Sequence, residues 1–163
     1  MSDGAIVVLG LGNVIMSDEG VGVHVIRRLL DDPRLPHTAR LIDGGTLGLE
    51  LLSIASDAEL LLVVDAVDLG LKPGSLVRLG PEELFGIDRG ASAHELGVAD
   101  LLSALRLLGA EPGHVVLLGV QPDRVELGTD LSPGVGAAVD RLLDEILAEI
   151  SAWEARAEVV CSA

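Results

Sequence analysis

Three acidic side chains and one histidine have the types and positions expected of a catalytic or metal-binding site. Glu19 follows an apolar run over residues 5–12, Asp43 ends a second apolar stretch, and Asp65 ends the run ELLLVVDAV. His94 stands in SAHELG, at the start of a helical pattern. In an open parallel sheet, sites form beyond the carboxyl ends of the strands, so these four side chains are expected to converge at one edge.

Each of these residues also has a structural interpretation. Asp65 is the most informative, because a carboxylate on a buried strand costs several kcal/mol unless it is paired or bound to a metal. A backbone amide or a hydroxyl group from a neighbouring loop would satisfy it equally well. Asp18 and Glu19 could complement a helix dipole, with Asp18 as the N-cap, and His94 could donate to a loop carbonyl. Residue types alone leave both interpretations open.

Taken together, Glu19, Asp65 and His94 form a set of two carboxylates and one imidazole. Such a set suits a divalent transition metal and leaves coordination positions open for water or a substrate group. Cys161 is the only cysteine, so a thiolate metal site and a disulfide framework are excluded. The three ligands come from separate elements, and no compact motif such as H-E-x-x-H joins them.

The stretch LGLGNVIMSDEGVG resembles a dinucleotide-binding loop only in part. The fingerprint G-x-G-x-x-G requires a third glycine for close helix packing, and Ile15 occupies that position. Asp18 and Glu19 lie where a phosphate would bind the start of the next helix, and two carboxylates there would repel it. A nucleotide-binding domain is therefore the weaker hypothesis, which a thermal shift with NAD or flavin would test.

The elements that must position these residues alternate between strands and helices. Continuous apolar runs predict buried parallel strands, weaker patterns add a fourth strand and an edge strand, and apolar stripes predict helices. The expected strands cover residues 5–12, 39–45, 59–67, 74–79 and 114–120, and the expected helices cover 19–31, 94–108 and a long segment that begins after Ser132. This order predicts an α/β fold, a three-layer α/β/α sandwich around a mostly parallel twisted sheet of about five strands.

Composition and charge exclude several classes of function. We expect one domain over residues 1–163, with a flexible tail from about residue 157. Eleven Lys and Arg residues against 26 Asp and Glu residues give a formal charge of −15, which would repel nucleic acid and an anionic membrane surface. The acidic start of the sequence and the absence of a run of about 20 apolar residues favour a cytoplasmic protein without a signal peptide or a membrane span. We also expect a monomer.

The sequence resembles the hydrogenase maturation endopeptidases, which trim the C-terminus of the large subunit of [NiFe] hydrogenases after nickel has been inserted. The resemblance rests on blocks in the same order and at compatible distances. They are VLGLGNVIMSDEGVGVHVI, LIDGGTLGLELL, LLLVVDAVDLGLKPGSLVRL, SAHELGVADLLSALRLLG, VVLLGVQPD and LSPGV. The resemblance implies an α/β peptidase whose partner is the hydrogenase large-subunit precursor.

The same resemblance implies roles for individual residues. The family's metal ligands match Glu19, Asp65 and His94, and the aspartate of its DGG motif matches Asp43, a candidate for cleavage chemistry or substrate contact. Many members have Asp where this sequence has Glu19, and either residue can ligate a metal. The metal implied is nickel already seated in the substrate, with Glu19, Asp43 or Asp65 as catalytic carboxylates. The alternative is a nickel-binding carrier without peptidase activity, in which the same ligands store the metal.

Overall fold

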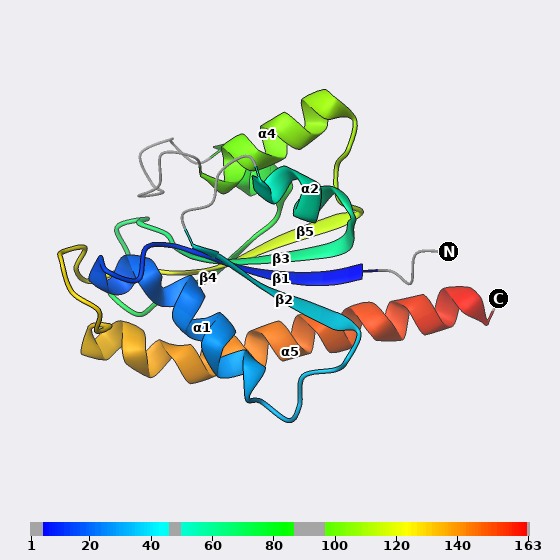
Figure 1. Ribbon diagram of the computed structural model, residues 1–163. Coiled ribbons are helices and arrows are strands. Elements are labelled where there is room, and N and C mark those ends of the chain that lie inside the picture. Colours follow the sequence, from blue (N-terminus) through cyan, green and yellow to red (C-terminus); the bar gives the residue numbers. More distant parts are fainter. Residues whose placement is uncertain (1–4, 46–49, 87–96, 163) are drawn as a thin grey trace.

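A twisted five-stranded sheet lies between two layers of helices (Figure 1). The structure is a computed structural model that describes residues 5–45, 50–86 and 97–162. Helices α2 and α4 cover one face of the sheet, and α1 and α5 cover the other (Figure 1). The predicted three-layer α/β/α sandwich is confirmed.

The strands follow the order β2-β1-β3-β5-β4 across the sheet. Four of them run parallel, and β4 pairs antiparallel with β5 at one edge. Their bounds are β1 Ala5–Leu11, β2 Ala39–Gly45, β3 Ala58–Ala66, β4 Leu76–Leu79 and β5 His114–Val120. All five predicted strands are present, including the expected edge strand. The carboxyl ends of β1, β2 and β3 therefore lie next to one another.

The structure has two short helices, over residues 50–56 and 81–86, that the sequence does not predict, and the predicted helices differ mainly at their starts. The first segment opens with a 3-10 turn, so the α-helix begins two residues later than expected. The helical bounds are η1 Ser17–Gly20, α1 Val21–Leu30, α2 Glu50–Ser56, α3 Pro81–Gly86, α4 Val98–Leu108 and α5 Pro133–Cys161. Gly97 is the N-cap of α4, and residues 87–96, which include His94, lie outside the described part of the chain.

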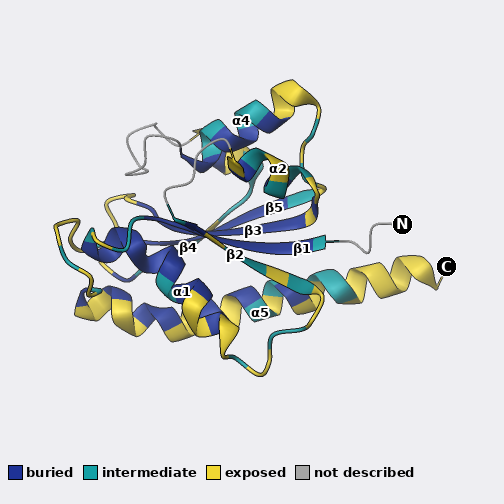
Figure 2. Cartoon of the chain, in the orientation of Figure 1, coloured by how far each residue is buried: buried dark blue, intermediate teal, exposed yellow. Residues whose placement is uncertain are grey.

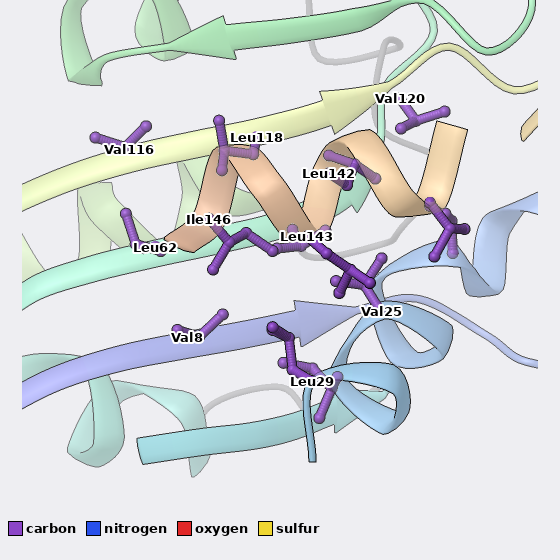
Figure 3. Packing of buried hydrophobic residues seen from close by; sticks show 14 of the residues in the cluster. Val8, Val25, Leu29, Leu62, Val116, Leu118, Val120, Leu142, Leu143 and Ile146 are labelled. Carbon is purple, nitrogen blue, oxygen red and sulfur yellow. The ribbon is translucent and has the colours of Figure 1, made fainter. Parts of the chain in front are cut away.

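Two aliphatic cores stabilise the sandwich. Alternate residues along each strand point to opposite faces, so Val8 and Leu62 belong to the core beneath α1 and α5, whereas Leu9 and Val63 belong to the core beneath α2 and α4. Figure 3 shows the first of these cores, with Leu142 and other α5 side chains packed over β3 and β5. The cores are built from Leu, Val, Ile and Ala, as the near absence of aromatic residues predicts.

Helix α1 approaches the sheet closely because two glycines face each other at the contact. A Cβ atom on Gly10 would lie 2.3 Å from the carbonyl oxygen of Gly22. A Cβ atom on Gly22 would lie 2.3 Å from the carbonyl oxygens of both Leu11 and Val64. The absence of side chains here lets the start of α1 rest on the backbone of β1 and β3, which fixes the turn that precedes it.

The last helix continues past the body of the domain (Figure 2). Ile150 is its last buried residue, and residues 157–161 are helical and exposed. Within the described ranges, no helix combines the length and apolarity that a membrane crossing requires.

Candidate active site at the carboxyl edge of the sheet

Asp65 lies at the carboxyl end of the central strand β3. Its neighbours across the sheet are β1 and β5, where Asp65 pairs with Gly119. The residue is 1% exposed, and its Oδ1 atom accepts a hydrogen bond of 2.8 Å from the backbone N–H of Ala66. Burial and an adjacent donor hold the carboxylate in a fixed orientation. Asp65 therefore occupies the position that the sequence predicts for a site residue.

Glu19 is brought to the same edge by the turn η1, which packs against β3. The turn follows β1 through Gly12, whose φ of 123° is disfavoured for residues with a Cβ atom. A Cβ atom at Gly12 would also overlap the carbonyl oxygen of Glu19 at 1.8 Å. Glu19 itself is 7% exposed. Two carboxylates from different elements are thus buried at one edge of the sheet.

The proposed third ligand, His94, lies outside the described residues. Within the ranges 5–45, 50–86 and 97–162, no group of three His, Cys, Asp or Glu side chains is arranged to hold a metal ion. Glu19 and Asp65 supply hard oxygen donors, which fit a divalent ion when an imidazole completes the set. The donor chemistry of the described residues is therefore compatible with the predicted metal, and a third ligand has to come from elsewhere.

Asp43 projects from the opposite face of the sheet. It pairs with Gly10 of β1, and Gly10 pairs with Val64 of β3, which belongs to the core beneath α1 and α5. Asp65, the next residue along β3, points to the face covered by α2 and α4. Asp43 is exposed and lines a hollow beside α1 together with Arg27. Two strand spacings, about 10 Å, separate the positions of Asp43 and Asp65 across the sheet.

Asp18 has a different role from the N-cap considered in the sequence analysis. The N-cap of η1 is Met16, and the Asp18 side chain is fully buried. Its Oδ2 atom accepts hydrogen bonds from the N–H groups of Asp123 (2.9 Å) and Arg124 (3.0 Å) and from the Ser132 hydroxyl (2.7 Å). Its Oδ1 atom accepts the N–H of Ser132 at 2.7 Å. We call these four hydrogen bonds the Asp18 clamp.

The clamp determines the ionisation of Asp18. Burial by itself raises the pKa of this carboxyl group, but the hydrogen bonds from Arg124, Ser132 and Asp123 outweigh burial and hold the pKa below the ordinary aspartate value. Asp18 is therefore an anion that ties η1 to the start of α5. No local pattern could reveal this role, because the partners lie 105 to 114 residues away in the sequence.

Backbone donors at the start of η1 are already used within the protein. The N–H of Ser17 donates to the carbonyl of Gly128 (2.8 Å), and the N–H of Asp18 donates to the carbonyl of Arg124 (3.3 Å). Ser17 has a φ of 50°, unusual for a residue with a Cβ atom, and its hydroxyl donates to the carbonyl of Glu126 (2.8 Å). A phosphate at this position would have to displace these bonds, which supports the argument against a nucleotide site.

Comparison with known proteins agrees with this architecture. The HycI hydrogenase maturation protease family matches residues 23–149. The Hydrogenase 2 maturation protease of Escherichia coli is 37% identical over 147 residues, covering 89% of this chain and 90% of that protein. The hydrogenase expression/formation protein HupD of Rhodobacter capsulatus is 39% identical over 151 residues, covering 91% of this chain and 72% of that protein.

A solved structure supports the same relationship. The hydrogenase maturating endopeptidase HybD from Escherichia coli superposes with a TM-score of 0.81 at 36% identity, covering 90% of this chain and 92% of that one. The chain belongs to the hydrogenase maturation protease family. The resemblance inferred from the sequence blocks is therefore confirmed, together with a peptidase role in hydrogenase processing.

Proposed function

We propose that this protein is an endopeptidase that removes the C-terminal peptide of a [NiFe]-hydrogenase large-subunit precursor after nickel has been inserted. The observation that carries the proposal is the pair of buried carboxylates, Glu19 and Asp65, at the carboxyl edge of a parallel sheet in a member of this family. The nickel belongs to the substrate, and Glu19, Asp65 and His94 recognise it through open coordination positions. Nickel-free precursor lacks that recognition element and is left uncut.

The buried carboxylates also supply the acid and base chemistry of the hydrolysis. Cleavage uses a water molecule polarised near the substrate nickel, and a carboxylate of the site accepts its proton. Glu19 is our choice for this base, because Asp43 projects from the other face of the sheet. We assign Asp43 to contact with the substrate chain, the second of the two roles suggested by the sequence. Asp65 orients the substrate metal from its buried strand.

The donor set favours checking over extraction of the metal. A site of carboxylates and one imidazole binds nickel less firmly than thiolate ligands do, and the only cysteine of this chain, Cys161, is exposed on the last helix. Metal held by thiolates in a substrate would therefore stay there while this protein contacts it. A nickel carrier would instead have to bind nickel more tightly than the thiolates of its partner do.

Intact mass spectrometry of the precursor tests the proposal. Nickel-loaded and nickel-free precursor are each incubated with the wild type, with Glu19→Gln, and with the control Glu59→Gln, an exposed glutamate on β3. We expect loss of a C-terminal peptide from the loaded precursor with the wild type and the control, and no loss with Glu19→Gln. Thermal denaturation confirms that all three proteins are folded.

The alternative outcomes separate the competing functions. An uncut loaded precursor, with stoichiometric nickel retained by the purified protein, would establish the carrier. Equal cleavage of loaded and nickel-free precursor would leave a peptidase but remove the nickel-reading role. Cleavage by Glu19→Gln at the wild-type rate would remove Glu19 from the chemistry.

A further inference from the structure

A hollow of about 140 Å³ opens beside α1 at the carboxyl ends of β1 and β2. Its polar lining consists of Asn13, Arg27 and Asp43, and glycines 12 and 45 form part of its wall. Gly12 also contacts the backbone of Glu19, so the wall of the hollow is shared with the turn that carries the proposed base. A substrate group in this hollow would lie next to the site already described.

Arg27 differs from most of the described arginines, which have a hydrogen-bond or ion-pair partner. Arg28, the next residue, pairs with Asp140 at 2.8 Å, and Arg34 pairs with Asp32 and Asp144. Arg78 and Arg106 also have carboxylate partners. Arg27 forms no hydrogen bond or ion pair with another described residue, although it shares the hollow with Asp43. In a chain with 26 acidic and 11 basic residues, this unused guanidinium is a local positive charge on a negative protein.

Asn13 adds a second donor. Its Oδ1 atom accepts the backbone N–H of Ile15 at 3.2 Å, which leaves the two amide hydrogens on Nδ2 available to a ligand. A guanidinium and an amide together match the planar oxygens of a carboxylate, which arginine binds in a bidentate manner. Asp43 offers the complementary function, an acceptor for an N–H group of the same ligand.

We propose that Arg27 and Asn13 form a subsite for a carboxylate of the precursor segment that is cut, while Asp43 accepts an N–H from that segment. This inference rests on the proposed function. Asp43 and Asp65 lie on strands two spacings apart and on opposite faces of the sheet, so the segment would reach the hollow around the carboxyl ends of the strands. The carboxylate belongs either to an acidic side chain near the cleaved bond or to the precursor's terminus.

Processing kinetics with the nickel-loaded precursor provide the first test. We compare the wild type with Arg27→Gln, Arg27→Lys and the matched control Arg28→Gln, which removes a neighbouring charge that faces α5. We expect Arg27→Gln to raise KM at least tenfold with kcat within twofold of the wild type. Arg27→Lys should recover part of this loss, and Arg28→Gln should match the wild type. The KM of the wild type should rise with salt, whereas that of Arg27→Gln should not.

Two precursor variants identify the source of the carboxylate. In one, the acidic side chains near the cleaved bond are changed to amides, and in the other the terminal carboxylate is amidated. Only the variant that lacks the bound carboxylate should make wild type and Arg27→Gln equal in KM. If both precursor variants preserve the full difference, a carboxylate is not the ligand of Arg27.

A binding assay separates this inference from the proposed function. The Glu19→Gln protein is used with and without Arg27→Gln, and its affinity for the intact precursor is measured by calorimetry. We expect at least tenfold weaker binding after the Arg27 change and no loss after Arg28→Gln in the same background. If the wild type cuts the precursor while Arg27→Gln and Arg28→Gln behave alike in both assays, the subsite is refuted and the peptidase stands. If nothing is cut, the binding difference still decides the subsite.

Discussion

Replacing Asp18 with Asn should destabilise the fold and slow processing together. Asp18 accepts three hydrogen bonds on Oδ2 and one on Oδ1, whereas the Asn amide has a single acceptor oxygen. The amide nitrogen would then face at least one donor, such as the buried N–H of Ser132. Losing one charge-assisted bond and weakening the other three should lower the free energy of unfolding by about 3 kcal/mol. For a chain of this size that is roughly 6–12 °C in Tm.

Urea denaturation followed by circular dichroism measures this loss. The control is Asp140→Asn, which removes an exposed ion pair with Arg28 and should change the free energy of unfolding by less than about 0.5 kcal/mol. Because Asp18 ties the turn before Glu19 to α5, the processing rate of Asp18→Asn should fall even at a temperature where the variant is fully folded. A loss of stability under about 1 kcal/mol, with normal processing, would refute the clamp.

The pH dependence of stability provides a second readout of the same clamp. Burial raises the pKa of Asp18, but the hydrogen bonds to its carboxylate lower the pKa by more than burial raises it. The folded-state pKa therefore lies below the unfolded-state pKa. The stability contributed by ionised Asp18 is therefore present above the unfolded pKa and is lost as pH falls through the folded pKa. The difference between wild type and Asp18→Asn should be constant above about pH 5 and shrink below about pH 4. A difference that grows on acidification would contradict this sign.

Three further substitutions test the scaffold. Gly22→Ala should lower the free energy of unfolding by about 2–3 kcal/mol in urea denaturation and reduce processing. Its Cβ atom would lie 2.3 Å from carbonyl oxygens of both β1 and β3 and push α1 outward. Unchanged stability would show that the helix can shift freely. Ile146→Val should cost about 0.5–1.5 kcal/mol by the same assay, since this α5 residue is fully buried against the sheet, and a neutral result would indicate a loosely packed core. Arg106→Gln removes an exposed ion pair with Glu111 and should leave Tm within about 2 °C of the wild type. A larger drop would mean that this ion pair stabilises the fold more than surface ion pairs usually do.

The strands were predictable because their signal is local. Runs such as LLLVVDAV are apolar on both faces, as expected of a strand in a sheet that helices cover on both sides. All five strands lie within two residues of the expected bounds. The same pattern placed Asp65 at the end of a buried strand, and its burial is confirmed at 1% exposure. The start of α1 was less predictable, since a 3-10 turn and an α-helix have similar apolar spacing over one turn.

The division of roles among the acids could not be predicted, because it depends on contacts distant in sequence. Asp18 and Glu19 are adjacent, yet it is the Asp18 side chain that accepts hydrogen bonds from the loop before α5 and from Ser132. Asp43 and Asp65 both end strands, yet the register of β2 against β1 sends them to opposite faces of the sheet. A shift of one residue in that register would reverse the assignment, and apolar patterning near the glycines 44 and 45 does not fix it.

The Asp18 clamp can form only late in the synthesis of the chain. The two partners, Asp18 and Ser132, are 114 residues apart, and Glu19, Asp43 and Asp65 are all translated before Ser132. Contacts of such long range form late and slow the folding of a domain. A growing chain can therefore contain these acidic residues while the turn that carries Glu19 still lacks its hydrogen bonds to Ser132. Peptidase activity would begin only after the last helix has been made and has docked on the sheet, so an unfinished chain would have no means of cutting the proteins around it.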